Sequence, residues 1–262
     1  MRFTRRALLA SAAGLACQGS ARAAGRLLSD DSVFELRQYT LRGGRRDTLI
    51  SLFENHFIES QDAVGADVIG VFRDLDDPDR LVWIRGFRDM SVRRKALGSF
   101  YNGPVWHSYG PAANATMIDS DNVLLLRPAS TGHGFGEFTT KSTGAGAMFG
   151  ADIYYLDTAP VAQFSQFFDS ILLPQFTAAG AQLVARLVTE EAKNDSPLPV
   201  REHDRTYVCL TRWSNLEAHG AFVRRYATLH GWRDSATEAI LPALMRKPER
   251  LRLEPTARSP LR

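Results

Sequence analysis

Polar and apolar positions repeat with two different periods along this chain, and the change between them predicts the order of strands and helices. Residues 33–41 alternate with a period of two, which is typical of a half-buried strand. The next apolar positions, Leu49, Phe53 and Phe57, recur at helical spacing until Gly65 ends the run. We therefore expect a strand followed by an amphipathic helix.

The rest of the first half completes a βαββαβ order. Two short apolar runs, 68–73 and 81–88, flank an acidic, turn-forming segment and predict a hairpin. A second helix follows over 92–100, with apolar positions four residues apart, and a last strand covers 122–127. An Asn-Gly-Pro break separates this helix from the strand.

The same order returns in the second half, with a longer hairpin loop. The predicted elements are a strand at 151–156, a helix opened by Thr158 and Pro160, a hairpin of 183–188 and 206–212, a helix after the capping box at 214–217, and a strand at 251–253. Pro174 is expected to kink or end the first of these helices.

The two halves also align residue by residue. Phe53, Gly65 and Val68 match Phe168, Gly180 and Leu183 at a spacing of 115 residues, and beyond the longer loop Phe87, Phe100 and Trp106 match Trp213, Tyr226 and Trp232 at a spacing of 126. A βαββαβ unit covers one sheet face with its helices and leaves the other bare, so two copies can cover each other. The expected fold is α+β: two tandem ferredoxin-like repeats that form a pseudo-dimeric α+β barrel, with a cavity between the sheets.

Residues 1–23 predict an export signal that is not part of the fold. A basic start precedes an apolar run over 7–16 and a small-residue cleavage site at 21–23. The arginine pair within 4–9 is typical of the twin-arginine route, with general secretion as the alternative, and Cys17 leaves lipidation as a less favoured one. We expect a periplasmic or secreted protein without stable membrane insertion after signal removal.

Composition divides the remainder into three parts. Residues 24–128 form the first repeat, the Gly/Ser/Thr-rich segment 129–147 is expected to be a flexible linker, and residues 148–262 form a second, diverged repeat. Joining the repeats removes one reason to dimerise, while a homodimer stays open as an alternative.

Charge and cysteine content narrow the function classes. Removing residues 1–23 takes away four arginines and no acidic residue, which leaves 28 basic against 29 acidic residues and a net charge of −1. Without a basic stripe we expect no nucleic-acid partner. One cysteine, Cys209, then remains, and it is expected to be a small buried hydrophobe rather than half of a disulfide.

Several segments of the first half resemble a known family. The run Phe34-Glu35-Leu36-Arg37-Gln38-Tyr39-Thr40-Leu41, a following glycine pair, the hairpin end Val82-Trp83-Ile84 and the run 100–106 are similar to the NIPSNAP family. The resemblance implies a dimeric α+β barrel, in agreement with the repeats. It implies little chemistry, because the wider superfamily holds cofactor-free monooxygenases, haem-using enzymes and proteins with no known reaction.

The candidate ligand-binding residues come first from the strand at 33–41. If Phe34 and Leu36 face the helices, Glu35, Arg37 and Tyr39 project into the cavity between the sheets. Glu35 and Arg37 then either pair with each other, which satisfies their charges, or contact a ligand.

Five further residues join the candidate site. Trp83 and Arg85 share a strand face, where they either clamp an anionic or aromatic ligand or pack as core. Trp106 and His107 follow the Asn-Gly-Pro break, in a segment expected to form a loop over the barrel mouth, and Tyr155 is expected opposite Tyr39. His107 is the candidate for acid–base catalysis, because a loop histidine beside aromatic residues can titrate near neutral pH.

These residues give no pattern for a metal or a serine nucleophile. No His-x-x-x-His pair, Cys/His cluster or Gly-x-Ser-x-Gly motif occurs, so we expect no metal and no cofactor. The favoured function is the binding of a small apolar or aromatic ligand in the cavity. The alternatives are a cofactor-free monooxygenase or isomerase acting on a small aromatic substrate through His107 or Tyr39, and a purely structural role.

Overall fold

The structure is a computed structural model that describes residues 32–136, 146–156, 161–228 and 244–262. The predicted signal peptide, the middle of the predicted linker and Trp232 lie outside these residues. Within the described part, no helix has the length and apolar character needed to cross a membrane.

The described residues form two βαββαβ units, as expected. The first contains β1 (Val33–Leu41), α1 (Arg46–Leu52), η1 (Phe53–Phe57), α2 (Ile58–Asp62), β2 (Asp67–Asp74), β3 (Arg80–Phe87), α3 (Met90–Tyr101), α4 (Pro104–Asn114) and β4 (Met117–Pro128). The second contains β5 (Met148–Leu156), α5 (Val161–Phe167), η2 (Phe168–Leu172), α6 (Leu173–Ala179), β6 (Gln182–Thr189), β7 (Arg205–Trp213), α7 (Leu216–Thr228) and β8 (Glu249–Pro255).

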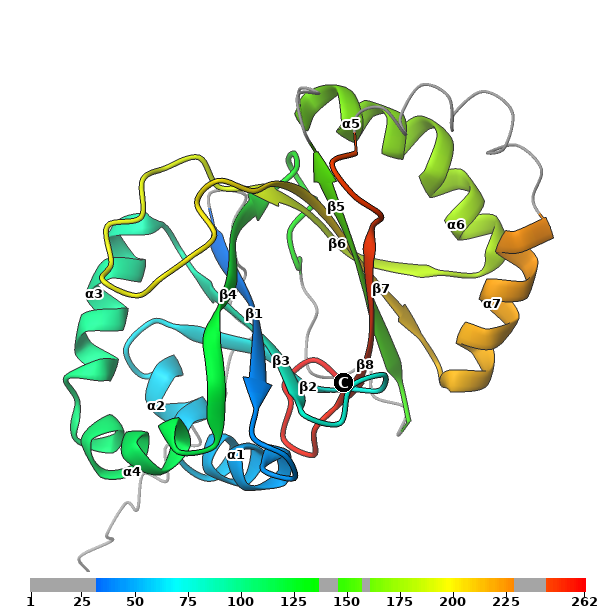
Figure 1. Cartoon of the computed structure of the whole chain (residues 1–262). Helices are drawn as coiled ribbons and strands as arrows, with labels where there is room; N and C mark the ends of the chain where they lie inside the picture. The colour runs from blue at the N-terminus through cyan, green and yellow to red at the C-terminus, as the bar shows by residue number, and fades with distance from the viewer. Residues whose placement is uncertain (1–31, 137–145, 157–160, 229–243) are drawn as a thin grey trace, which may run out of the picture.

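The eight strands close into one barrel in the order β1-β3-β2-β8-β5-β7-β6-β4. The two repeats join at equivalent places, where β2 pairs with β8 and β4 pairs with β6. The helices of the first repeat cover one side of the barrel and those of the second repeat cover the opposite side (Figure 1). This confirms the predicted pseudo-dimeric α+β barrel.

The barrel interior holds a continuous apolar cluster. Phe34, Leu36, Phe72, Phe149 and Leu253 are among its members, and each is at most 1% exposed. From the predicted linker segment, Phe135 packs edge-on against the Phe34 ring at 5.0 Å and is 3% exposed. The space that the sequence suggested as a ligand cavity is therefore lined by packed side chains in the part of the chain that the structure describes.

The orientation of β1 is the reverse of the expected one. Phe34 and Leu36 point into the barrel, whereas Tyr39 belongs to the cluster beneath the helices, together with Trp83 and Phe53. Both faces of β1 are buried along almost its whole length. A period of two separates the faces of such a strand, but it does not tell which face meets the helices.

Each repeat has a five-residue π-helical segment in its first helix. The segments η1 and η2 begin at Phe53 and Phe168, which are the residues matched by the 115-residue spacing. Pro174 lies in the first turn of α6, directly after η2, and the helix continues to Ala179. Pro174 therefore does not end the helix, because a proline without an amide hydrogen is tolerated at the start of a helical segment. The π-helical turn before it is not caused by the proline, since η1 has the same turn with no proline in α2.

Candidate functional site

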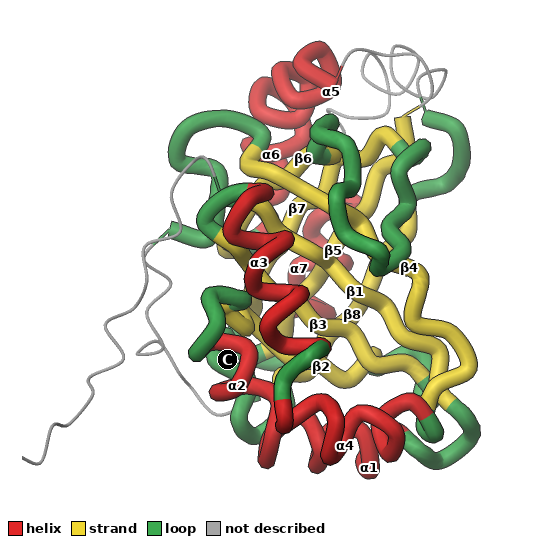
Figure 2. Tube along the Cα trace, turned by 90° about the vertical axis from the view of Figure 1, so that its left-hand side faces the viewer, coloured by secondary structure: helices red, strands yellow, loops and turns green. Residues whose placement is uncertain are grey.

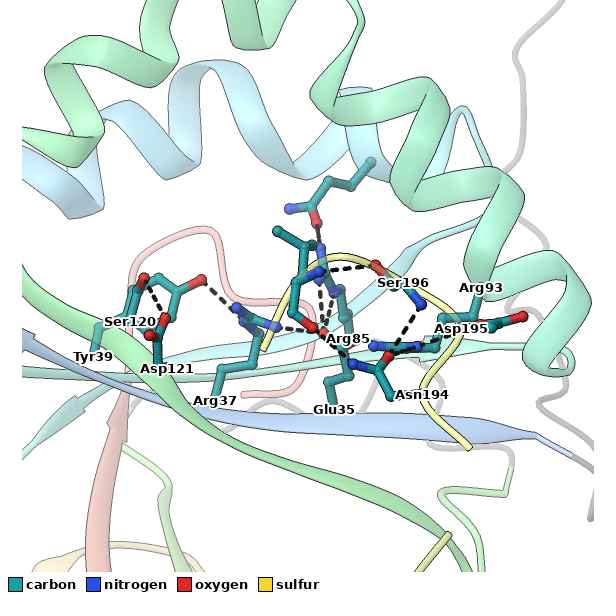
Figure 3. Close-up of polar contacts among 12 residues, drawn as sticks. Glu35, Arg37, Tyr39, Arg85, Arg93, Ser120, Asp121, Asn194, Asp195 and Ser196 are labelled. Carbon is teal, nitrogen blue, oxygen red and sulfur yellow. Dashed lines mark hydrogen bonds and ion pairs between the residues drawn. The ribbon is translucent and has the colours of Figure 1, made fainter. Parts of the chain in front are cut away.

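A buried ionic cluster lies on the outer face of the first repeat's sheet, around Glu35 (Figure 3). Arg37 Nη1 lies 2.7 Å from Glu35 Oε2, and Arg85 Nε donates to the same oxygen at 2.8 Å. Arg93 Nε, from α3, donates to Glu35 Oε1 at 2.7 Å. Glu35, Arg85 and Arg93 are fully buried, and Arg37 is 3% exposed.

The secondary structure explains why these four groups meet. Glu35 and Arg85 face each other in the β1–β3 ladder, and Arg37 follows on the same face of β1. Arg93 lies one turn from Ala96 and Leu97, on the helical face that packs toward the sheet.

The three guanidinium groups set the charge of the carboxylate. Burial alone would raise the pKa of Glu35, but Arg85, Arg37 and Arg93 outweigh it and hold that pKa well below its ordinary value. Burial likewise would lower the pKa of Arg37, while Tyr39 and Glu35 raise it above its ordinary value. One carboxylate therefore faces three cations, and the four buried groups carry a net charge of +2.

Polar and aromatic groups extend the cluster along β1 and β3. Arg37 Nε donates to Tyr39 Oη at 2.9 Å, and the Arg37 guanidinium lies 5.4 Å from the Trp83 ring centroid. Arg85 Nη1 donates to Gln61 Oε1 at 2.8 Å. Burial raises the pKa of Tyr39, so its side chain is a neutral phenol near pH 7.

An aromatic-lined cavity of about 20 Å³ adjoins this cluster. Tyr39, Gln61 and Trp83 line it on the side of the sheet and the ionic cluster, and Phe53, Phe57, Phe100, Tyr101 and Trp106 line it on the side of the helices. This volume accommodates about one water molecule, so a ligand with an aromatic ring needs more space than this state provides.

The outer wall of the cavity is made by η1 and α4. Trp106 of α4 packs against Phe57 of η1, with ring centroids 5.6 Å apart. Further out, the His56 and Tyr109 rings stack at 3.6 Å with an interplanar angle of 8°. α4 contacts α1, η1 and α3 (Figure 2), and π-helical turns such as η1 occur frequently at functional sites.

A loop from the second repeat closes the Arg93 end of the cluster. We name residues 190–204, between β6 and β7, the strap; it reaches across to α3 (Figure 1). Arg93 Nη1 donates to Asn194 Oδ1 at 2.9 Å and lies 3.9 Å from Asp195 Oδ1. The strap accounts for the change of repeat spacing from 115 to 126 residues.

The structure brings six of the predicted site residues together and separates two. Glu35, Arg37, Tyr39, Trp83, Arg85 and Trp106 belong to the cluster or line the cavity. His107 lies on the exposed side of α4 and does not line the cavity, because residues 104–114 form a helix rather than the expected loop.

Tyr155 is not the counterpart of Tyr39. Its ring belongs to the cluster inside the barrel, and its hydroxyl donates to Glu249 Oε2 at 2.9 Å. Tyr154, which follows Tyr39 by 115 residues, lies on the outer face beneath the helices of the second repeat. The expected pairing was wrong by one residue, and in a strand one residue changes the face.

The sequence analysis missed three residues of the site, although two of them are polar residues on an apolar helical face. Gln61 continues the spacing-four row of Phe53 and Phe57, and Arg93 shares a helical face with Ala96. A polar residue on an apolar face is informative, because its burial needs a partner. Asn194 has no such signal, since its partner is 101 residues away.

The second repeat builds the same ladder without the ionic cluster. Gly150 faces Thr211 where Glu35 faces Arg85, and Asp152 faces Cys209 where Arg37 faces Trp83. The Trp213 ring lies where a side chain at position 150 would have to lie, within 2.8 Å of an ideal Cβ. Cys209 is fully buried, as predicted. Among the described residues, no group of three side chains is arranged to bind a metal ion.

Comparison with solved structures supports the fold over most of the chain. A "putative monooxygenase" from Fusobacterium nucleatum is 7% identical, with a TM-score of 0.58, and the match covers 86% of this chain and 92% of that one. A "putative monooxygenase" from Lactobacillus acidophilus is 15% identical, with a TM-score of 0.54 and coverage of 86% and 94%. An anthrone oxidase-like protein is 14% identical, with a TM-score of 0.54 and coverage of 90% and 97%.

At these identities the likeness shows the fold and no activity. No curated protein matches the chain. The NIPSNAP family model matches residues 34–132, which include β1 from its second residue, β2, β3 and β4, and every member of the ionic cluster around Glu35. Residues 34–132 are therefore similar in sequence to the NIPSNAP family, within a chain whose fold is that of the dimeric α+β barrels.

Proposed function

We propose that the first repeat binds a small aromatic molecule between its sheet and the helices η1 and α4. The observation that carries this proposal is the aromatic-lined cavity beside the buried ionic cluster, which the second repeat lacks. Burying charged groups is unfavourable for folding, and replacing such a cluster by apolar residues is often stabilising. A cluster that the architecture does not need supports a role in function.

Binding requires the cavity to widen, and α4 is the wall that can move. Its main contacts are with other helices, and the stacked His56 and Tyr109 rings join it to η1 at the surface. Stacking at an exposed position contributes only about 1 kcal/mol, so ligand contacts can replace it. The bound ring would then lie among Phe53, Phe57 and Trp106.

The proposal includes the compartment. The basic start and apolar run of residues 1–23 support export, by the twin-arginine or the general secretory route. A protein exported already folded by the twin-arginine route can carry a ligand with it, whereas one exported unfolded meets its ligand outside the cytoplasm.

The alternative function is a cofactor-free monooxygenase or isomerase acting on a small aromatic substrate in the same cavity. It is supported by the position of Tyr39, whose neutral phenol lines the cavity and accepts a hydrogen bond from Arg37. A neutral phenol can donate a proton or a hydrogen bond to a substrate oxygen. His107, on the exposed side of α4, has less support for this role.

The first experiment is native mass spectrometry, with an absorption spectrum, of the mature protein purified from its own host. A retained aromatic molecule supports the proposal. Binding of aromatic probes is then measured for Ala113→Phe, which fills the cavity, and Ala112→Phe, its exposed neighbour on α4. We expect Ala113→Phe to abolish binding and Ala112→Phe to retain it; equal binding by both variants would place the ligand elsewhere.

A second measurement separates binding from catalysis. Any retained or tightly bound molecule is incubated with the protein in air, and its conversion is followed by mass spectrometry. Saturable binding without conversion supports a binding module. Conversion that Tyr39→Phe abolishes and His107→Ala retains supports the enzyme with Tyr39 as the proton donor, and the reverse result supports His107.

A further inference from the structure

The buried cluster has more positive charge than its own carboxylate can neutralise. Glu35 is the one acidic group that accepts hydrogen bonds from the three arginines in the described structure. The next carboxylate, Asp195, has a partly exposed side chain 3.9 Å from Arg93 Nη1, and it also lies 3.7 Å from Arg94 Nε. A buried site with surplus positive charge attracts anions.

The same region has a surplus of hydrogen-bond donors. Arg93 Nη2 and Trp83 Nε1 are buried, and neither has an acceptor among the described residues. Native proteins leave few buried donors unpaired, and each such donor calls for an explanation. A negatively charged acceptor atom at this place would accept from the unpaired donors and would also neutralise part of the excess positive charge.

The second repeat shows that the surplus charge is not required by the barrel, although it too has buried donors without an acceptor among the described residues, such as Trp213 Nε1. At the positions of Glu35, Arg37 and Arg85 it has Gly150, Asp152 and Thr211, and the strand ladder keeps its register. The surplus charge is thus a property of the site and not of the fold.

The unpaired donor of Trp83 connects the charge to the cavity. Tyr39 and Trp83 line the cavity, and the Arg37 guanidinium lies 5.4 Å from the centroid of each of their rings. A group bound beside Trp83 Nε1 would therefore lie close to the Arg37 charge, while a ring attached to it would extend toward Phe53 and Phe57.

From this geometry, and resting on the proposed function, we infer that the ligand is an aromatic oxyanion, such as an aromatic carboxylate. Its charged oxygen accepts from Trp83 Nε1 and balances Arg37, and its ring occupies the aromatic side of the cavity. The site then selects anionic over neutral aromatic molecules of the same shape.

The test compares 2-naphthoate with 2-naphthamide, which have the same ring and nearly the same shape but differ in charge. Calorimetry of the mature protein should show the carboxylate binding at least 10-fold more tightly. Arg37→Met should weaken carboxylate binding by roughly 10-fold or more, because the bound anion loses its balancing cation, and leave the amide nearly unchanged. Arg37→Lys, which keeps the charge, should recover part of the selectivity.

Two further variants keep the test decisive if Arg37→Met folds poorly. Trp83→Phe keeps an aromatic ring and removes the unpaired donor, so it should weaken carboxylate binding by roughly 10- to 100-fold, as expected for a lost hydrogen bond to a charged group. Arg94→Met, at an exposed arginine beside Arg93, is the matched control and should bind like the parent protein. Equal affinity of the parent for both probes would overturn the inference while leaving the proposed function intact, whereas failure of both probes would overturn both.

Discussion

Glu35 holds the polar part of the first repeat together, since all three arginines of the cluster donate to it. Its loss leaves three buried cations without a counter-charge, which is more unfavourable than the loss of any one arginine. Removing one partner of a buried ion pair typically destabilises a protein by about 3–5 kcal/mol.

We predict that Glu35→Gln lowers the free energy of unfolding by about 3 kcal/mol or more at pH 7. The pKa of Glu35 is lower in the folded than in the unfolded protein, so this stabilisation is fully present above the unfolded value of about 4.3. It is lost as the pH falls below that value.

Urea denaturation at pH 7, 5, 4 and 3 measures this effect. The difference between parent and variant should be constant from pH 7 to 5 and shrink below pH 4. Glu254→Gln, at an exposed position of β8, is the control and should change stability little at any pH. A difference that does not depend on pH would show that Glu35 is not the titrating group.

At the residue scale, the sequence identified most residues of the site but not the side of the sheet on which they lie. The alternation of β1 placed Glu35, Arg37 and Tyr39 on one face, and the structure keeps them there. It could not tell which face meets the helices, because both faces of the strand are buried. Tyr155 was misplaced for a related reason, since the repeats were aligned one residue out of step.

At the element scale, α4 combines a tight internal contact with its position as the cavity wall. The Trp106 ring folds back onto the backbone of Gly110, where an ideal Cβ would lie 2.7 Å from the ring. Gly98 in α3 has no neighbouring atom within 4 Å of such a Cβ. The two helical glycines thus form a natural pair for comparison.

We predict opposite effects of the two alanine substitutions. Gly98→Ala should raise the free energy of unfolding by about 0.5–1 kcal/mol, because alanine is the better helix former. Gly110→Ala should lower it by about 1–3 kcal/mol and weaken ligand binding, because the methyl group displaces Trp106. Thermal unfolding and probe titration measure both, and stabilisation by Gly110→Ala would show that Trp106 is free to move.

The sequence pattern predicted most of the helices and strands correctly, and the exceptions have physical reasons. Strong apolar periods identified β1, the first helix of each repeat, and the hairpins. The helix α4 was missed because its Gly-Pro start and the internal Pro111 resemble a loop. The π-helical turns η1 and η2 have no sequence pattern of their own. A π-helical turn adds one residue to a turn of the helix, and this hardly changes the spacing of the apolar positions.

At the scale of the whole molecule, the strap makes the two repeats different, because it belongs to the second repeat and packs against the first. Leu198 packs against the cluster that contains Phe87 and Ala96, and Asn194 binds Arg93. The second repeat therefore closes a site that belongs to the first. The sequence indicated the longer loop but not its contacts, because they join residues about 100 positions apart.

We predict that Leu198→Ser loosens the first repeat selectively. Hydrogen exchange should become faster in α3 and remain unchanged in α5 and α6, which do not touch the strap's apolar contact. Lys193→Ser, at an exposed strap position, is the control and should leave exchange unchanged in both repeats. Equal acceleration in both repeats would indicate that the strap stabilises the whole barrel instead.

The closed barrel, in which the first repeat has the Glu35 cluster and the described part of the second does not, has a consequence for how such a chain can change over evolution. In a barrel made of two identical subunits, every substitution appears twice, so a site cannot be lost in one copy and kept in the other. Here each copy varies alone. One repeat is free to become scaffolding, as Gly150 and Trp213 illustrate, while the other retains its ionic cluster. Selection on the cluster and selection on stability then act on different parts of one gene.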